Sequence, residues 1–72
     1  MNTSSFETFG CWFGVQEFAR EHPYIYYRAP LDSRPVPCAI VKLFKNGKIR
    51  LAYHDVSFTI DRAHLDRLFW RS

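Results

Sequence analysis

The sequence lacks the features that mark membrane-spanning and exported chains. No apolar run approaches the roughly 20 residues that a membrane-spanning helix needs. The stretch MNTSSFETFG contains neither a basic segment nor a continuous apolar segment, so we expect no signal peptide. Cysteine is also scarce: we expect Cys11 and Cys38 to be reduced residues of a cytoplasmic protein rather than a disulfide. These absences argue against a membrane partner.

Motifs for catalysis and for metal binding are missing as well. Neither cysteine stands in a nucleophile motif with one of the three histidines. The closest groups of metal-binding types are Asp61-x-x-His64 and His54-Asp55, which a helix N-cap and a hairpin end explain without a metal. A chain this short also has little room for a deep pocket. We therefore predict a domain that is not an enzyme and has no metal or cofactor.

The length and the aromatic content indicate the number of domains and the size of the core. Residues 1–72 make a single small domain, and residues 1–5 are expected to be disordered. A domain of this size buries limited surface and has little stability to spare. Aromatic residues make up 18% of the chain, which is enough either to build a dense core from few positions or to leave rings for a partner.

The positive charge is concentrated in the middle of the chain. The net charge is +3, but residues 28–50 alone carry six basic residues against one acidic residue. Lysines on a hairpin keep the edge of a sheet soluble. The same charges on one surface would attract an anionic partner. Both interpretations stay open on the sequence alone.

The clearest local signal is a hairpin at Asn46-Gly47, which separates two runs of alternating apolar residues. A two-residue type I′ turn there would place Lys45 opposite Lys48 and leave Lys42 as a polar exception on the core face. For the next strand, we expect Tyr53 opposite Phe58. The core face of the hairpin would then carry Ile40, Phe44, Ile49, Leu51 and Tyr53.

The other patterns complete an α+β fold with a small antiparallel sheet. Pro23 ends an N-terminal helix, and the proline-rich segment after Ala29 is a loop that suggests an edge position near Pro37. Asp61 is a good N-cap for a last helix. The predicted elements are strands at about residues 24–29, 37–44, 48–54 and 57–60, an N-terminal helix at about 13–21 and a short C-terminal helix at about 62–69.

A five-residue rhythm in the hairpin carries a resemblance to a known class. Gly47, Ile49, Leu51, Tyr53 and Asp55 give a glycine, alternating apolar residues, an aromatic residue and an aspartate. In this rhythm and in the order of its strands, the run of residues 27–68 resembles the SH3-like small β-barrels, in particular Tudor-type modules. The resemblance implies a closed barrel that acts as a binding module. It leaves the ligand undecided, because no full aromatic cage is assignable.

Nucleic acid is one candidate partner. Lysines that face each other at a hairpin tip cost stability unless they stay solvated or meet an anion. Tyrosine rings beside arginine offer stacking surfaces for bases. The candidate nucleic-acid-binding residues are Arg28, Arg34, Lys45, Lys48, Arg50, Tyr24 and Tyr26.

A protein partner is the alternative. Trp12, Phe13 and Trp70 are large aromatic residues without a clear place in the predicted core. Such residues, together with an accessible strand edge, are typical of interfaces. The chain would then be a small inhibitor, an adaptor or a homodimer.

Overall fold

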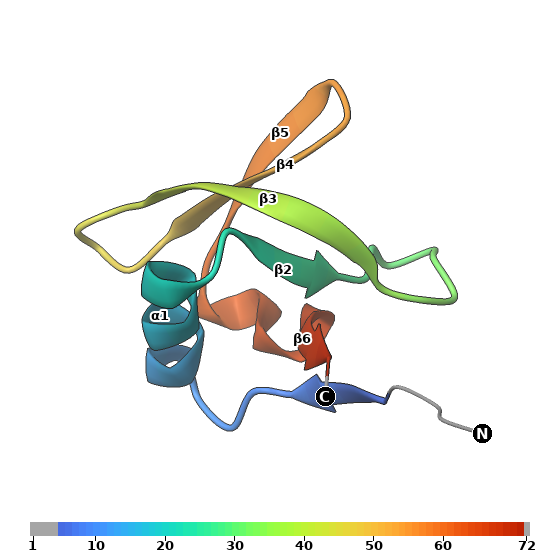
Figure 1. Ribbon diagram of the computed structural model, residues 1–72, viewed down its shortest axis with the longest axis horizontal. Helices are drawn as coiled ribbons and strands as arrows, with labels where there is room; N and C mark the ends of the chain where they lie inside the picture. The colour runs from blue at the N-terminus through green and yellow to red at the C-terminus, as the bar shows by residue number, and fades with distance from the viewer. Residues whose placement is uncertain (1–4, 72) are drawn as a thin grey trace.

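The computed structural model describes residues 5–71, which form one six-stranded antiparallel sheet, one α-helix and one 3-10 helix. The strand order is β1-β6-β2-β3-β4-β5, so β1 and β5 are the two edges (Figure 1). The expected disorder of residues 1–5 falls mostly outside the described residues. The elements are β1 (Phe6–Thr8), α1 (Trp12–Glu21), β2 (Tyr24–Tyr27), β3 (Val36–Leu43), β4 (Ile49–Tyr53), β5 (Val56–Ile60), the 3-10 helix η1 (Arg62–Arg67) and β6 (Leu68–Arg71).

The predicted SH3-like barrel is wrong, because the sheet stays open. Closure would require β5 to pair with the far edge, but β1 pairs only with β6 and β5 only with β4. The chain ends add β1 and β6 beside β2 and so widen the sheet. The concave inner face is filled by side chains of α1 and η1. The sheet therefore has an inner face, which α1 and η1 cover, and an outer face.

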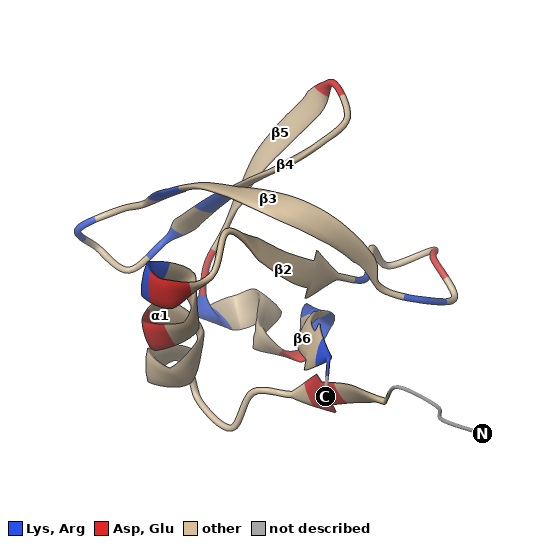
Figure 2. Ribbon diagram, viewed as in Figure 1, with Lys and Arg blue, Asp and Glu red and all other residues tan. Residues whose placement is uncertain are grey.

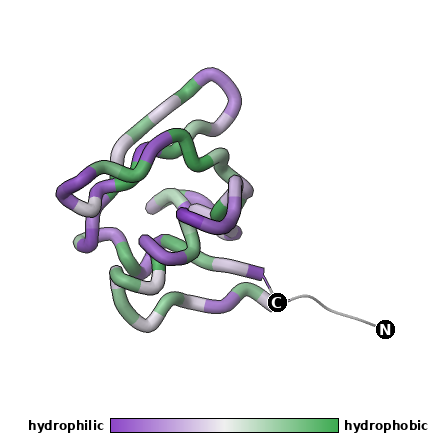
Figure 3. Tube along the Cα trace, turned by 60° about the vertical axis from the view of Figure 1, so that its left-hand side comes forward, coloured by the Kyte–Doolittle hydropathy of each residue, from purple (hydrophilic) through white to green (hydrophobic). Residues whose placement is uncertain are grey.

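The inner face holds the core. Val15 of α1 is fully buried against the buried residues of five strands, and Leu65 of η1 packs on the same cluster. Figure 3 shows hydrophobic and hydrophilic residues alternating along the strands, as expected when one face is covered and the other meets water. The strand residues of this core are Ile25, Cys38, Ile49, Leu51, Ile60 and Leu68.

The helix α1 begins one residue before the predicted start and ends at the predicted residue. Cys11 precedes it in an extended conformation without a side-chain cap. The backbone N–H of His22 still bonds to Phe18, and Pro23 then prevents a further turn. This ending brings the chain directly into β2.

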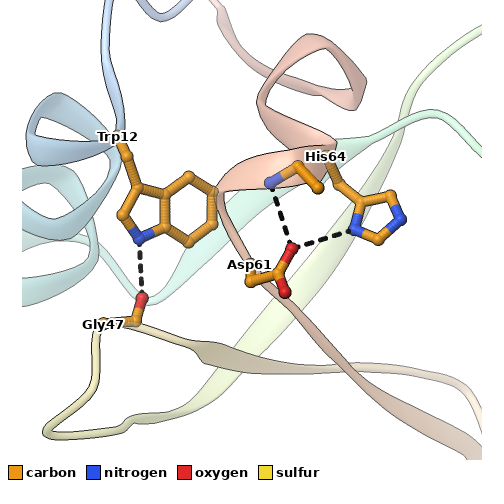
Figure 4. A network of polar contacts seen from close by, with 5 residues as sticks. Trp12, Gly47, Asp61 and His64 are labelled. Carbon is orange, nitrogen blue, oxygen red and sulfur yellow. Dashed lines mark hydrogen bonds and ion pairs between the residues drawn. The ribbon is translucent and has the colours of Figure 1, made fainter.

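The predicted C-terminal helix over residues 62–69 is wrong. Asp61 does cap a helical segment, since its carboxylate accepts a hydrogen bond from the Ala63 N–H at 3.0 Å (Figure 4). That segment is a 3-10 helix, which ends at Arg67. Leu68 is fully buried on the inner face of β6, and the β-prone aromatic residues that follow it extend the sheet. Packing in the sheet overrides the short helical pattern.

The hairpin at Asn46-Gly47 exists, but its turn differs from the predicted type I′ turn. The Phe44 N–H bonds to the Lys48 carbonyl, and the Gly47 N–H bonds back to the Phe44 carbonyl. These bonds make a three-residue loop in which Gly47 alone has a positive φ, of 89°. The Asn46 side chain accepts a hydrogen bond from the Lys48 N–H at 3.1 Å, which stabilises this longer loop. Phe44 therefore faces Lys48.

A β-bulge explains the polar exception on the predicted core face. Ile40 pairs with Leu51 and Lys42 pairs with Arg50, so β3 has one residue more than β4 at this point. Val41 is the extra residue and is largely exposed. The bulge turns Lys42 to the outer face and returns Leu43 to the core.

The register of β5 also differs from the prediction. Tyr53 pairs with Val56 and Leu51 with Phe58, two residues away from the expected pairs. The turn is His54-Asp55, and His54 adopts a φ of 54°. Histidine tolerates this left-handed region better than the β-branched Val56 would. The tight turn leaves β5 as a full five-residue edge strand.

Candidate nucleic-acid interface

The outer face of the sheet is the surface turned away from α1 and η1. The pairing of the strands assigns each residue to a face, since directly opposed residues point to the same side. In the middle of this face lie Ala39 and Ala52, which are opposite each other. Because these side chains are small, they form a flat strip of the outer face, which we call the alanine strip. The outer-face residues around the strip are Phe6, Thr8, Tyr24, Tyr26, Pro37, Lys42, Arg50, Ser57, Thr59, Phe69 and Arg71.

Cations border the strip on both sides. Lys42 lies directly opposite Arg50, and Arg50 lies opposite Thr59 on the next strand. Two like charges in opposed positions repel each other, so this pair favours an anion between or above its members. Figure 2 shows the Lys and Arg segments that gather along the β3–β4 hairpin. No acidic residue of the described chain occupies an outer-face position of the sheet.

A second cationic group surrounds Phe69 on β6. The guanidinium carbon of Arg28 lies 5.3 Å from the centre of the Phe69 ring, and that of Arg71 lies 5.5 Å from the Phe6 ring. Phe6 in turn contacts Tyr26 edge to face at 5.0 Å. Such contacts hold an arginine in place while its N–H groups stay free to bind an anion. We call Phe6, Tyr26, Arg28, Phe69 and Arg71 the arginine–aromatic cluster.

Tyr24 is the most accessible ring on the outer face, with 59% of its surface exposed. Its cross-strand neighbour is Ala39, so no large side chain covers it from β3. The pairing of β2 with β6 stops at Tyr26 and Phe69, two residues short of Tyr24. At this point a hollow of about 510 Å³ opens between the strands and the end of α1. We call it the fork hollow; its lining residues are Phe18, His22, Tyr24, Tyr26, Trp70 and Arg71.

The structure brings four of the seven predicted nucleic-acid-binding residues to the outer face: Tyr24, Tyr26, Arg28 and Arg50. Lys45 and Lys48 are exposed at the hairpin tip, beside the strand that carries Arg50. Arg34 lies elsewhere, in the loop between β2 and β3, where it lines a different hollow together with Asp32. That carboxylate makes the surroundings of Arg34 less suitable for an anion.

The three residues of the predicted protein interface have different surroundings. The indole of Trp12 is half-buried and donates a hydrogen bond to the Gly47 carbonyl at 2.7 Å (Figure 4). Phe13 is exposed on α1, and Trp70 lines the fork hollow.

A second hollow, of about 500 Å³, lies on the inner face. We call it the inner hollow; Tyr27, Tyr53 and Phe58 supply its rings, and Tyr27 and Phe58 stand 4.9 Å apart. Cys38 lines it with a thiol that is 3.7 Å from the Val36 carbonyl oxygen. Burial raises the pKa of the Cys38 thiol above its ordinary value of 9.0, which keeps it protonated and weakly nucleophilic at neutral pH.

Several residues of the candidate interface were missed by the sequence analysis. Lys42 was assigned to the wrong face, because a bulge leaves no clear mark in a single sequence. Phe6, Phe69 and Arg71 were missed because β1 and β6 pair across nearly the whole length of the chain. The only available signal was the β-prone run LFWR at the end of the sequence.

Residues 5–71 contain no cluster of three or more His, Cys, Asp or Glu side chains that would hold a metal ion. In that same part of the chain, no helix has both the length and the apolar character to cross a membrane. Cys11 and Cys38 are both free thiols. Comparison of the chain with protein-family models, with curated proteins and with solved structures gave no match.

Proposed function

We propose that this chain is a small, non-catalytic module that binds nucleic acid on the outer face of its sheet. The observation that carries the proposal is the composition of that face: the cations Lys42, Arg50 and Arg71 occupy it, and none of its described sheet positions carries a carboxylate. Phosphate groups supply the complementary charge, and the exposed Tyr24 ring supplies a stacking surface for a base.

The geometry of the strip also favours a polymer over a small anion. The Lys42–Arg50 pair is on one side of Ala39 and Ala52, and the arginine–aromatic cluster is on the other. A small anion would contact one group at a time. A strand with regularly spaced phosphates can contact both groups while it crosses the alanine strip. The free thiols Cys11 and Cys38 support the cytoplasmic location that forms part of this proposal.

The test is a titration of the ¹⁵N-labelled protein with short DNA and RNA, single-stranded and duplex, at low and moderate salt. We expect amide shifts on β2, β3, β4 and β6 and affinities that weaken steeply with salt. Lys42→Ala combined with Arg50→Ala should reduce the affinity and flatten its salt dependence. Arg20→Ala combined with Arg62→Ala is the matched control, since these exposed arginines are outside the outer face. An equal loss in both variants, or no shifts for any nucleic acid, would contradict the proposal.

A second candidate function is the binding of an extended peptide along β5. This edge strand contains no proline and no charged residue, and Val56 on it is 61% exposed. Edges with these features accept an additional strand. The inner hollow lies directly beside the edge and would receive an apolar side chain of that peptide. Shifts confined to residues 53–60 on addition of a partner would favour this candidate over nucleic acid.

A further inference from the structure

We infer that the fork hollow is a slot for one unstacked nucleobase, which makes single-stranded nucleic acid, rather than duplex, the ligand of this module. The inference rests on the proposed function, because the hollow borders Tyr24, Tyr26 and Arg71 of the outer face. It adds a specific position for a base, and it gives roles to Trp70, Phe18 and His22, none of which the cationic surface requires.

The backbone creates the hollow. β2 begins at Tyr24 and β6 continues to Arg71, yet their pairing covers only Tyr26–Phe69 and Tyr27–Leu68. Beyond Tyr26, β2 remains paired with β3 and β6 remains paired with β1. The two strands are therefore held by different neighbours at the point where their own pairing ends. The opening is a fixed feature of the sheet and does not require a strand to unfold.

The side chains of the fork hollow suit a flat aromatic ligand. Five of its six lining residues carry rings, and the sixth is Arg71. Phe18 and His22 are already stacked on each other, with ring centres 4.1 Å apart and planes inclined by 22°. This stack forms a broad wall from the end of α1. Tyr24, largely exposed at the start of β2, adds a further ring to the lining. A planar base fits between surfaces of this kind and gains stacking energy from each.

Arg71 gives the hollow its preference for a nucleotide over an uncharged aromatic side chain. Arg71 is also a member of the arginine–aromatic cluster, where its guanidinium lies over Phe6. A base inside the hollow would carry its own phosphate towards this cation at the rim. The next phosphates along the strand would reach Arg28, which lies over Phe69, or the Lys42–Arg50 pair across the alanine strip.

A duplex does not satisfy this arrangement. Its bases are stacked on each other, so neither face of a base is available to Tyr24 or to the Phe18–His22 wall unless a base pair first opens. Phosphate contacts on the outer face would still form with a duplex. The expected preference for a single strand thus reports on the fork hollow, whereas the salt dependence reports on the cations.

The experiment uses the full chain and an oligothymidylate of about 8 nucleotides, a length typical of small single-strand-binding modules, together with a duplex of the same length. Binding of the single strand should shift the indole N–H signal of Trp70, which lines the fork hollow, whereas binding of the duplex should leave that signal in place. Tyr24→Ala should weaken single-strand binding roughly tenfold, the loss of one stacked base, and should leave duplex binding unchanged. Phe13→Ala is the matched control, since Phe13 is equally exposed on a different surface.

The outcomes separate this inference from the proposed function. If the single strand binds with the expected salt dependence, but Trp70 does not shift and Tyr24→Ala behaves as Phe13→Ala does, the fork hollow is not a base slot while the cationic face stands. Equal affinity for single strand and duplex overturns the inference in the same way. If neither binds at low salt, both proposals fail. A second variant, Trp70→Phe, keeps a ring in β6 and should retain the fold while it alters single-strand affinity alone.

Discussion

The indole nitrogen of Trp12 donates a hydrogen bond to the carbonyl oxygen of Gly47 at 2.7 Å, across 35 positions of the sequence. The first residue of α1 is thereby fixed to the tip of the β3–β4 hairpin. Gly47 is buried by this contact, although the rest of the tip is exposed. This hydrogen bond fixes the position of α1 relative to the hairpin on the inner side of the sheet. It leaves the outer face uncovered.

Trp12→Phe removes this bond and leaves the Gly47 carbonyl without its donor. We expect a loss of about 1–3 kcal/mol in the free energy of unfolding, the range for a buried acceptor that loses its partner. Urea denaturation followed by circular dichroism measures it. Phe13→Leu, one residue later and exposed, should change the stability by less than about 0.5 kcal/mol. Equal effects of both substitutions would show that the indole bond contributes nothing specific.

Alanine at two glycines should have opposite effects on stability. Gly47 has a φ of +89°, and an added Cβ would lie 2.9 Å from the Gln16 side-chain nitrogen, so Gly47→Ala should cost about 1–2 kcal/mol. Gly14 lies inside α1, where a Cβ would meet Phe9 at an ordinary 3.8 Å. Gly14→Ala should therefore stabilise the protein by about 0.5–1 kcal/mol. Thermal denaturation of both variants checks the signs, and a stabilised Gly47→Ala variant would contradict the three-residue loop.

The hairpin shows how far the sequence predicts the fold. Asn46-Gly47 identifies the position of the turn because only a few residues accept left-handed backbone. The same dipeptide is compatible with a two-residue and a three-residue loop, and the choice depends on contacts with Trp12 and Gln16 from a distant helix. The bulge at Val41 is equally a matter of tertiary packing, since it lets Leu43 reach the core.

The same limit applies to the candidate interface. Tyr24, Tyr26 and Arg28 could be identified because alternation within one strand gives their faces. The fork hollow could not be identified, because it depends on which strands lie side by side, and the first residues of β6, Leu68 and Phe69, were predicted as the end of a helix. Leu68 satisfies either a helical or a strand pattern, and burial in the sheet decides between them.

Lys42→Glu should raise the stability and lower the affinity for nucleic acid. The glutamate would stand opposite Arg50 and replace a repulsive cross-strand pair with an attractive one, worth about 0.2–1 kcal/mol. The same change puts a negative charge on the proposed binding face and should weaken binding of an oligonucleotide at low salt. Denaturation curves and fluorescence anisotropy measure the two effects. A loss of stability would contradict the assignment of Lys42 to the outer face.

Cys38 should make the stability fall at alkaline pH. Burial raises its pKa above 9.0 in the folded chain, so the unfolded chain loses the proton first. The contribution of the protonated thiol is complete below the unfolded value and is lost as the pH rises towards the folded one, with a slope of at most about 1.4 kcal/mol per pH unit. Urea denaturation of the wild-type protein and Cys38→Ala between about pH 7 and pH 10 tests this. Parallel curves for the two proteins would contradict it.

The hairpin tip allows a test of whether binding follows local charge or total charge. Lys45→Glu combined with Lys48→Glu should leave the fold intact, since both side chains are exposed and the loop depends on Asn46, Gly47 and backbone bonds. The affinity for single-stranded nucleic acid should fall sharply. If each lysine contacts one phosphate, the slope of log affinity against log salt should also become shallower by roughly 1.4.

Arg20→Glu combined with Arg62→Glu provides the control, because it changes the net charge by the same amount at exposed sites away from the tip and the outer face. Arg20 forms an exposed ion pair with Glu17, and the loss of such a pair has little effect on stability. A large loss of affinity for the tip variant and a small loss for the control would place the tip within the interface. Equal losses would mean that net charge alone governs association, and an unchanged affinity of the tip variant would confine the interface to the sheet, where Lys42, Arg50 and the fork hollow remain.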